Sequence, residues 1–245
     1  NPVCSPRRAA LLTGRYPARY SIHEHFAGHK NSAPRQMPDW LDPEARTLPR
    51  ILKASGYATA HYGKWHLTNN DLASAPDVGQ YGYDDYAGWN GIKPVASFTE
   101  IFDKTLDFVQ KAEKEDKPAF VNLWIHEAHT PHVPSNEAMD AFSGLTEQQR
   151  VYAAVIKDGD DGVGKILAGL DRMGLAENTI IFFSSDNGAE RTATDKKMEG
   201  GLGTYYSVGE TGGLKGRKRS LYEGGIRVPF IVRWAGKVPA NYTDS

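Results

Sequence analysis

The chain contains one cysteine, Cys4, which lies near its start and is followed four residues later by Arg8. A single cysteine can form neither an internal disulfide nor a cysteine-rich zinc site. It is therefore either a small buried side chain or a residue with a special chemical role. In a helix, Arg8 lies one turn beyond Cys4, where its guanidinium group could offset the charge of an anion. The neighbours of Cys4 decide between the two roles.

Polar residues with acid–base or ligand chemistry gather at three further places, each of which directly follows a strand-like run. These places are residues 63–66 (GKWH), 126–134 (HEAHTPHVP) and 186–188 (DNG). In a doubly wound sheet, ligands bind beyond the carboxyl ends of the strands. All three clusters meet that expectation. In an extended segment, Lys64 and His66 also point to the same side, so both could face one bound anion.

The elements that position these clusters alternate between helix and strand, which predicts an α/β layer fold. Helical spacing of apolar residues predicts helices at residues 48–55, 98–112 and 151–170. Apolar or β-branched runs predict strands at residues 57–62, 118–125, 179–185 and 227–234, and the run at 179–185 is expected to be a core strand. The polar, Gly-rich stretch at residues 199–225 is too long for a simple turn, and we interpret it as a functional loop.

Composition and charge restrict the class of protein. Hydrophobic residues make up 40% of the 245 residues and charged residues 24%, which is typical of a globular chain that buries one core. The 29 basic residues nearly balance 30 acidic residues, so nothing suggests a nucleic-acid or membrane surface, and we expect a small partner. No apolar run approaches the ~20 residues of a membrane span, and no secretory signal is visible.

Residues 4–15, CSPRRAALLTGR, resemble the first signature of the sulfatase family, with Arg7 where a serine is usual. The resemblance implies that a formylglycine-generating enzyme oxidises Cys4 to the aldehyde formylglycine. One hydroxyl of the aldehyde hydrate would attack sulfur, and deprotonation of the second would later expel sulfate and restore the aldehyde. Such covalent catalysis divides one difficult hydrolysis into two easier steps. Arg8 is suited to hold the hydrate with its fixed fork of donors.

Residues 56–67, GYATAHYGKWHL, resemble the second sulfatase signature. By this resemblance, Lys64 binds the sulfate oxygens, and His66 hydrogen-bonds the formylglycine hydrate and assists its deprotonation.

The histidine cluster after residue 125 contains His126, His129 and His132 at a mutual spacing of three. Such spacing could indicate a transition-metal site, but histidine is also the commonest general acid near neutral pH, and we favour that reading. Sulfatases have a His-any-Pro element here, which His129 matches best. His129 would then contact the sulfate and protonate the departing alcohol, with His132 as the rival residue and His126 as support.

Asp186 and Asn187 follow the predicted strand at residues 179–185, where sulfatases place two oxygen ligands of a divalent cation, usually calcium. Calcium takes six to eight oxygens, so two residues do not complete a site. Family members carry two adjacent aspartates at the end of their first strand. The adjacent pairs here, at residues 84–85 and 160–161, lie in a predicted loop and a polar helix. We therefore expect the missing ligands upstream of Asn1, in a chain truncated at its start.

Residues 214–229, LKGRKRSLYEGGIRVP, resemble a further sulfatase block in which a lysine before Glu-Gly-Gly contacts the sulfate. That position is Lys218. Arg217 and Arg219 stand where glycine is more usual, so the loop conformation is expected to differ there.

Together these resemblances cover nearly all of residues 1–245 and imply the alkaline-phosphatase-like α/β/α sandwich of a sulfatase catalytic domain. We expect a largely parallel central sheet that lacks its first strand and the C-terminal subdomain. The implied function is hydrolysis of a carbohydrate or aryl sulfate in a periplasmic or secreted, bacterial protein. The alternatives are a phosphonate monoester hydrolase or phosphodiesterase of the same superfamily, and an inactive anion-binding relic.

Overall fold

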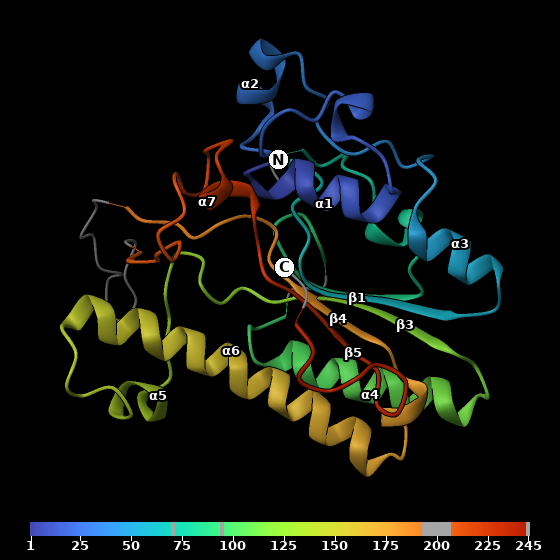
Figure 1. Cartoon of the computed structure of the whole chain (residues 1–245). Coiled ribbons are helices and arrows are strands. Elements are labelled where there is room, and N and C mark those ends of the chain that lie inside the picture. The colour runs from blue at the N-terminus through green and yellow to red at the C-terminus, as the bar shows by residue number, and fades with distance from the viewer. Residues whose placement is uncertain (70–71, 94–95, 193–206, 244–245) are drawn as a thin grey trace.

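A computed structural model describes residues 1–69, 72–93, 96–192 and 207–243 of the chain (Figure 1). The helices are α1 (Cys4–Thr13), α2 (His29–Ser32), α3 (Leu48–Ala54), α4 (Glu100–Lys114), α5 (Asn136–Asp140), α6 (Glu147–Arg172) and α7 (Glu223–Ile226). The strands are β1 (Ala58–Lys64), β2 (Asp85–Trp89), β3 (Ala119–Trp124), β4 (Ile181–Ser184) and β5 (Phe230–Arg233). No helix in these described parts is both long and apolar enough to cross a membrane.

The elements form layers, with helices on both sides of the strands. Three parallel strands make a sheet in the order β2-β1-β3. In Figure 1, α1 and α3 lie above the strands, whereas α4 and α6 lie below them. Helix α4 contacts β1 and β3, and α6 packs against α4. This arrangement confirms the predicted α/β fold with a parallel sheet.

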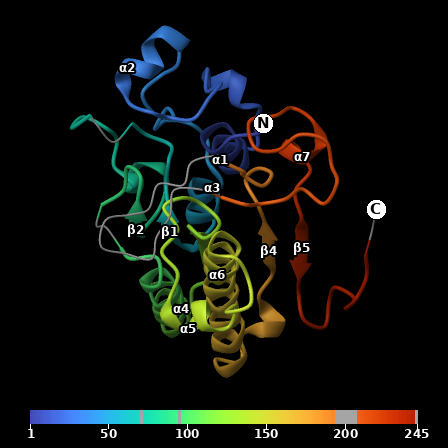
Figure 2. The same cartoon turned by 90° about the vertical axis from the view of Figure 1, so that its left-hand side faces the viewer.

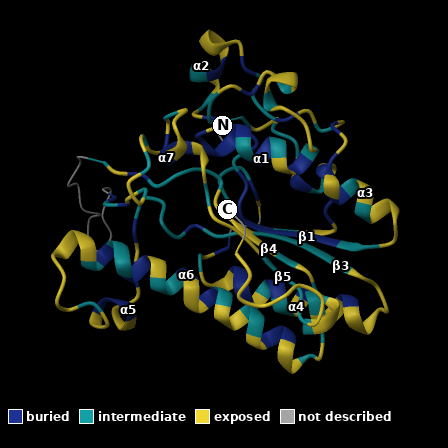
Figure 3. Ribbon diagram, in the orientation of Figure 1, coloured by how far each residue is buried: buried dark blue, intermediate teal, exposed yellow. Residues whose placement is uncertain are grey.

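Strand β1 is the centre of the fold, and nearly all of its residues are buried (Figure 3). Ala60 and Tyr62 belong to the apolar cluster that includes residues of α4. On the same strand, Gly63 has a φ of 101°, and a Cβ there would collide with the backbone of Trp124 on β3. Only glycine fits this close approach. Consequently β1 and β3 pack tightly just before β1 ends at Lys64.

The predicted helices are present as α3, α4 and α6, and the predicted strands as β1, β3, β4 and β5, but β2 was not predicted. The Asp84–Asp85 pair was assigned to a loop, which is wrong because Asp85 begins β2 and pairs with Ala60 of β1. The carboxylates of Asp84 and Asp85 both accept hydrogen bonds from residues of β1. Asp84 accepts hydrogen bonds from the backbone and side chain of Thr59 at 3.0 Å, and Asp85 accepts one from the Tyr62 hydroxyl at 2.9 Å.

The last two strands form a sheet of their own. Strand β4 pairs with β5 in antiparallel orientation, and Figure 2 shows the two side by side. The expectation of a core strand at residues 179–185 is wrong, because Phe182 is 61% exposed and Phe230 of β5, on which its ring stacks, is 66% exposed. The β-branched and aromatic composition predicted the strand correctly, but composition does not determine which faces are covered.

Candidate active site

Cys4 is the first residue of α1 and only 4% exposed. Its Sγ atom lies 3.5 Å from Nζ of Lys64 and 3.8 Å from Oδ1 of Asn187. A thiol forms only weak hydrogen bonds with such groups, because it is a weak donor and a weak acceptor. The two hydroxyl groups of a formylglycine hydrate would find a donor in Lys64 and an acceptor in Asn187. The surroundings of Cys4 therefore fit the modified residue, for which Sγ stands in here.

Arg8 lies one turn further along α1 and connects three parts of the site. Its Nε and Nη2 atoms donate to Oδ2 of Asp186 at 3.1 and 2.8 Å, and Nη1 donates to the carbonyl of Lys64 at 2.9 Å. The guanidinium plane also lies over the Trp124 ring, 4.6 Å from its centroid. The prediction that Arg8 faces the same site as Cys4 agrees with this geometry.

Asp186 lies among positive charges. Burial alone would raise its pKa, but the charges of Arg8 and Lys64 outweigh burial and lower the pKa to about 2. Burial, and then the charges of Arg8 and Lys218, lowers the pKa of Lys64 as well, because nearby positive charge disfavours another cation. The buried site is therefore rich in cations, which suits it to binding an anion.

His66 lies near this site, but not for the predicted reason. Strand β1 ends at Lys64, and His66 adopts a left-handed φ of 58°, so the two residues do not share an extended segment. The backbone turns there because the N–H of His66 donates to the carbonyl of Asn90 at 2.9 Å. The expectation that Lys64 and His66 alternate to one side of a strand is thus wrong.

The His66 ring has a defined hydrogen-bonding state. Its Nε2 atom lies 2.8 Å from the carbonyl oxygen of Phe26, which can only accept, so Nε2 carries the hydrogen. Burial, and then the charge of Lys64, lowers the pKa of His66 to about 3. The ring is therefore neutral at pH 7. Its Nδ1 atom is buried without a hydrogen-bond partner among the described residues, which leaves a lone pair that can accept a proton.

The loop that carries Lys218 packs directly against Asp186 and Asn187. The N–H of Gly188 donates to the carbonyl of Gly225 at 2.9 Å, and a Cβ on Gly188 would collide with the backbone of Gly224. Glycine at these positions allows the two segments to meet. Part of the predicted functional loop, residues 199–206, lies outside the described residues.

The predicted sulfate ligand Lys218 has a partner that the sequence did not reveal, namely Glu190. Nζ of Lys218 lies 2.7 Å from Oε2 of Glu190, and Arg219 binds the other carboxylate oxygen. Burial would raise the pKa of Glu190, but these two cations lower it to about 2. Arg219 has a φ of 74°, which explains why glycine suits this position better. No sequence signal distinguishes Glu190, because its role depends on the Lys218 loop.

The three histidines after β3 have different surroundings. Nδ1 of His129 donates to the carbonyl of Thr130 at 2.5 Å. Burial, and then the charges of Lys64 and Lys218, lowers the pKa of His129 to about 3. His132 instead meets the hydroxyl of Ser207 at 2.9 Å. The buried lysines Lys64 and Lys218 thus act electrostatically on His129.

His126 is mainly a packing residue in this arrangement. Its ring stacks on Phe98 with centroids 3.9 Å apart, and burial lowers its pKa to about 4. Its Nε2 atom lies 3.2 Å from the carbonyl of Pro131. Within the described ranges, no group of three or more His, Cys, Asp or Glu side chains could hold a metal ion.

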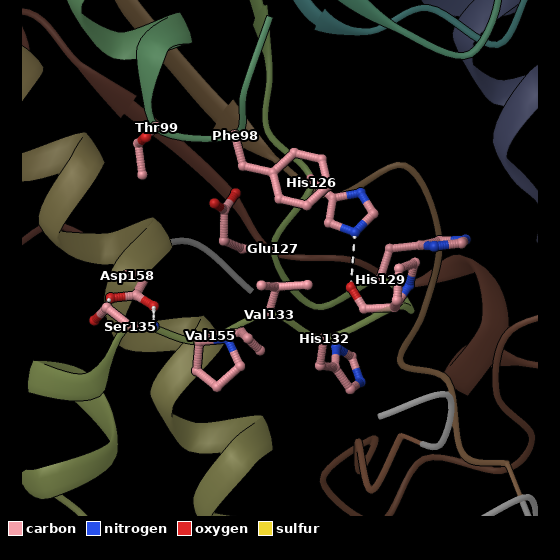
Figure 4. A pocket seen from close by; sticks show the side chains of 12 residues that line it. Phe98, Thr99, His126, Glu127, His129, His132, Val133, Ser135, Val155 and Asp158 are labelled. Atoms are coloured by element: carbon pink, nitrogen blue, oxygen red, sulfur yellow. Dashed lines mark hydrogen bonds between the residues drawn. The ribbon is translucent and has the colours of Figure 1, made fainter. Parts of the chain in front are cut away.

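The histidines also line a pocket of about 220 Å³ (Figure 4). Its other walls come from the start of α4, the segment after β3, and α6. The lining includes Phe98, Glu127, Val133, Val155 and Asp158. Figure 4 shows Asp158 and His129 on opposite sides of this pocket. The pocket is thus next to the cationic site, and His129 is common to both.

Asp186 and Asn187 have the hard oxygen donors that calcium prefers. They lie beside Cys4, as the distance of 3.8 Å between Asn187 Oδ1 and Sγ shows. Their oxygen atoms are the type of ligand that calcium binds, but these two residues supply only part of the six to eight ligands that calcium takes.

Known proteins resemble this chain both in sequence and in structure. The family model described as Sulfatase matches residues 1–245. N-acetylgalactosamine-6-sulfatase of Sus scrofa is 31% identical over 275 residues, covering 98% of this chain and 50% of that protein. Arylsulfatase G of Canis lupus familiaris is 27% identical, with coverages of 99% and 52%. The chain therefore spans about half the length of the curated relatives it matches.

Solved structures give the same picture. The crystal structure of Ps i-CgsB matches with a TM-score of 0.77 and 26% identity, covering 98% of this chain and 57% of that chain. Ps i-CgsB in complex with k-i-k-neocarrahexaose matches with a TM-score of 0.76 and 25% identity. These matches extend over almost all of the chain, including every segment that contributes to the site.

Proposed function

The chain belongs to the sulfatase family, and from this premise we propose that it hydrolyses sulfate monoesters of saccharides with a formylglycine formed from Cys4. The observation that carries the proposal is the position of Cys4 Sγ, 3.5 Å from Nζ of Lys64 inside a buried, cation-rich site. A saccharide substrate is supported by the relatives, since one is named for N-acetylgalactosamine 6-sulfate and another was crystallised with a neocarrahexaose.

The formylglycine hydrate supplies one hydroxyl that attacks sulfur as the alcohol departs, and a second whose deprotonation releases sulfate and restores the aldehyde. The protein side chains bind and stabilise the charged groups. Arg8 and Lys64 hold the hydrate and the sulfate oxygens, and Lys218 adds a third positive charge. Because all three cations are buried, their attraction for an anion is little screened by water.

Two histidines move protons in this proposal, at different atoms. His66 accepts the proton of the second hydroxyl at Nδ1, since its Nε2–H is held by the carbonyl of Phe26. His129 donates to the departing alcohol from Nε2, since its Nδ1–H is held by Thr130. Burial, and then the charges of Lys64 and Lys218, lowers the pKa of His129, and a bound sulfate would offset the part that comes from the two lysines.

Asp186 and Asn187 would hold a divalent cation, for which calcium is the best match to their oxygen donors. Its positive charge would orient the nucleophile and offset the charge of the sulfate. Among the described residues, Asp186 is not part of any group of three or more His, Cys, Asp or Glu side chains that could hold a metal ion.

The proposal is tested by sulfate release from N-acetylgalactosamine 6-sulfate after coexpression with a formylglycine-generating enzyme, with calcium present. We expect turnover that depends on modified Cys4, and little turnover of an aryl phosphonate of similar size. Faster cleavage of the phosphonate would contradict the assignment of sulfate as the substrate. Tight binding of inorganic sulfate without any turnover would identify an anion-binding protein instead.

A further inference from the structure

The two sides of His129 have opposite charge. On one side lie the buried cations Lys64 and Lys218, whose charges lower the pKa of His129. On the other side is the pocket of Figure 4, which is lined by the carboxyl groups of Glu127 and Asp158. No lysine or arginine lines this pocket among the described residues. A substrate that spans His129 would therefore meet positive charge at one end and negative charge at the other.

Glu127 is the less satisfied of the two carboxyl groups. Its Oε2 atom is buried and has no hydrogen-bond partner among the described residues. Burial raises the pKa of Glu127, and the charge of Asp158 adds to this effect. Asp158, by contrast, accepts hydrogen bonds from the backbone and hydroxyl of Ser135 at 2.8 and 2.7 Å. An unpaired buried acceptor costs free energy, which a donor on a bound ligand would recover.

The apolar walls of the pocket complete its chemistry. Val155 of α6 is buried, whereas Val133 is 52% exposed at the rim. Phe98 presents its ring next to Glu127, and its stacking on His126 fixes one wall. Apolar walls with few polar groups are typical of sites for small molecules, and the polar groups select the ligand. Here the polar groups include two carboxyl groups, Glu127 and Asp158, which are hydrogen-bond acceptors.

We infer that this pocket is the subsite for the alcohol part of the substrate, and that Glu127 selects an alcohol carrying hydroxyl, amide or ammonium donors against one carrying a second anionic group. This inference rests on the proposed function, because it takes His129 as the boundary between sulfate and alcohol. A sugar with a free amine would be favoured, and a sugar with a carboxylate would be rejected by Glu127 and Asp158.

The test measures binding of three unsulfated methyl glycosides to the full chain by saturation-transfer NMR and titration: galactoside, galactosaminide and galacturonide. Binding of these alcohols requires neither formylglycine nor calcium. We expect the ammonium sugar to bind best and the carboxylate sugar to bind at least roughly tenfold more weakly than the neutral one. Equal binding of the three, tighter binding of the galacturonide, or no binding of any would overturn the inference.

Variants then identify Glu127 as the selecting residue. Glu127→Gln keeps the shape and removes the charge, so the preference for galactosaminide over galacturonide should fall by roughly tenfold. Glu137→Gln removes a carboxylate from the exposed residue Glu137 of α5 and should change nothing. An unchanged preference in a folded Glu127→Gln variant would exclude Glu127 as the selecting residue. The comparison of the three sugars on the unaltered chain remains a test of the subsite even if that variant misfolds. Selective binding without sulfate ester hydrolysis would reject the proposed function and keep the subsite.

Discussion

Two nitrogen atoms of Arg8 donate hydrogen bonds to one oxygen of Asp186, although 178 residues separate the two side chains. This ion pair joins the first turns of α1 to the segment after β4. Both partners are largely shielded from water, with side-chain exposures of 8% and 25%. The pair therefore links the integrity of the fold to the geometry of the active site.

Removing Asp186 should destabilise the protein strongly. Asp186→Ala leaves the guanidinium of Arg8 buried without its counter-charge, for which we expect a loss of about 3 kcal/mol in the free energy of unfolding. Asp171→Ala is the matched control, because Asp171 pairs with Arg233 at 3.6 Å in an exposed position. That change should cost less than about 1 kcal/mol. Urea denaturation measures both, and equal losses would contradict the importance of the buried pair.

Modification of Cys4 is directly measurable. After coexpression with a formylglycine-generating enzyme, the peptide that contains Cys4 should have the mass of the aldehyde. Cys4→Ala should then abolish turnover while the unfolding midpoint changes little, since one small side chain replaces another. A protein that keeps its thiol where a control sulfatase is converted would rule out the proposed nucleophile.

The roles of His129 and His132 are separated by the quality of the leaving group. A general acid contributes about 10²- to 10⁴-fold when the departing alcohol is poor, and little when it is an activated phenol. His129→Ala should therefore slow a sugar sulfate far more than an activated aryl sulfate. His132→Ala should slow both mildly and equally. A selective loss at His132 instead would transfer the acid role to that residue.

His61 should make stability depend on pH. It is fully buried, and burial followed by the charge of Arg8 lowers its pKa to about 3. Between about pH 3 and 6.5 the unfolded chain binds a proton that the folded chain does not, so stability must fall as the pH decreases through this range. His61→Phe should reduce the slope by up to about 1.4 kcal/mol per pH unit.

The control for His61 is His23→Gln, which changes an exposed histidine. Phenylalanine keeps the ring contacts of His61 with Trp65 and Trp124, so packing is largely preserved. Urea denaturation at several pH values between 4 and 6 gives the slope for each protein. If stability depends on pH in the same way in His61→Phe and in the unaltered protein, then His61 is protonated in the folded state. The assignment of a neutral, buried His61 ring would then be wrong.

The sequence was most informative where chemistry depends on local spacing. Arg8 one helical turn after Cys4, and Lys64 at the carboxyl end of β1, could be placed because helix and strand periodicities are fixed. Contacts made between distant segments could not be placed. Glu190 gains its role only from Lys218 and Arg219, and the turn at His66 depends on a backbone bond to Asn90.

The burial of Cys4 restricts when its proposed oxidation to formylglycine could take place. In the folded chain only 4% of Cys4 is exposed. Another enzyme could therefore bind and oxidise this residue only if the start of α1 were unfolded. The contacts that enclose it come from Lys64 and Asn187, which are synthesised 60 and 183 residues later. The proposed oxidation would therefore be possible while the nascent chain is still growing, but not after Asn187 has docked against Cys4. Rapid folding would then compete with complete oxidation of Cys4.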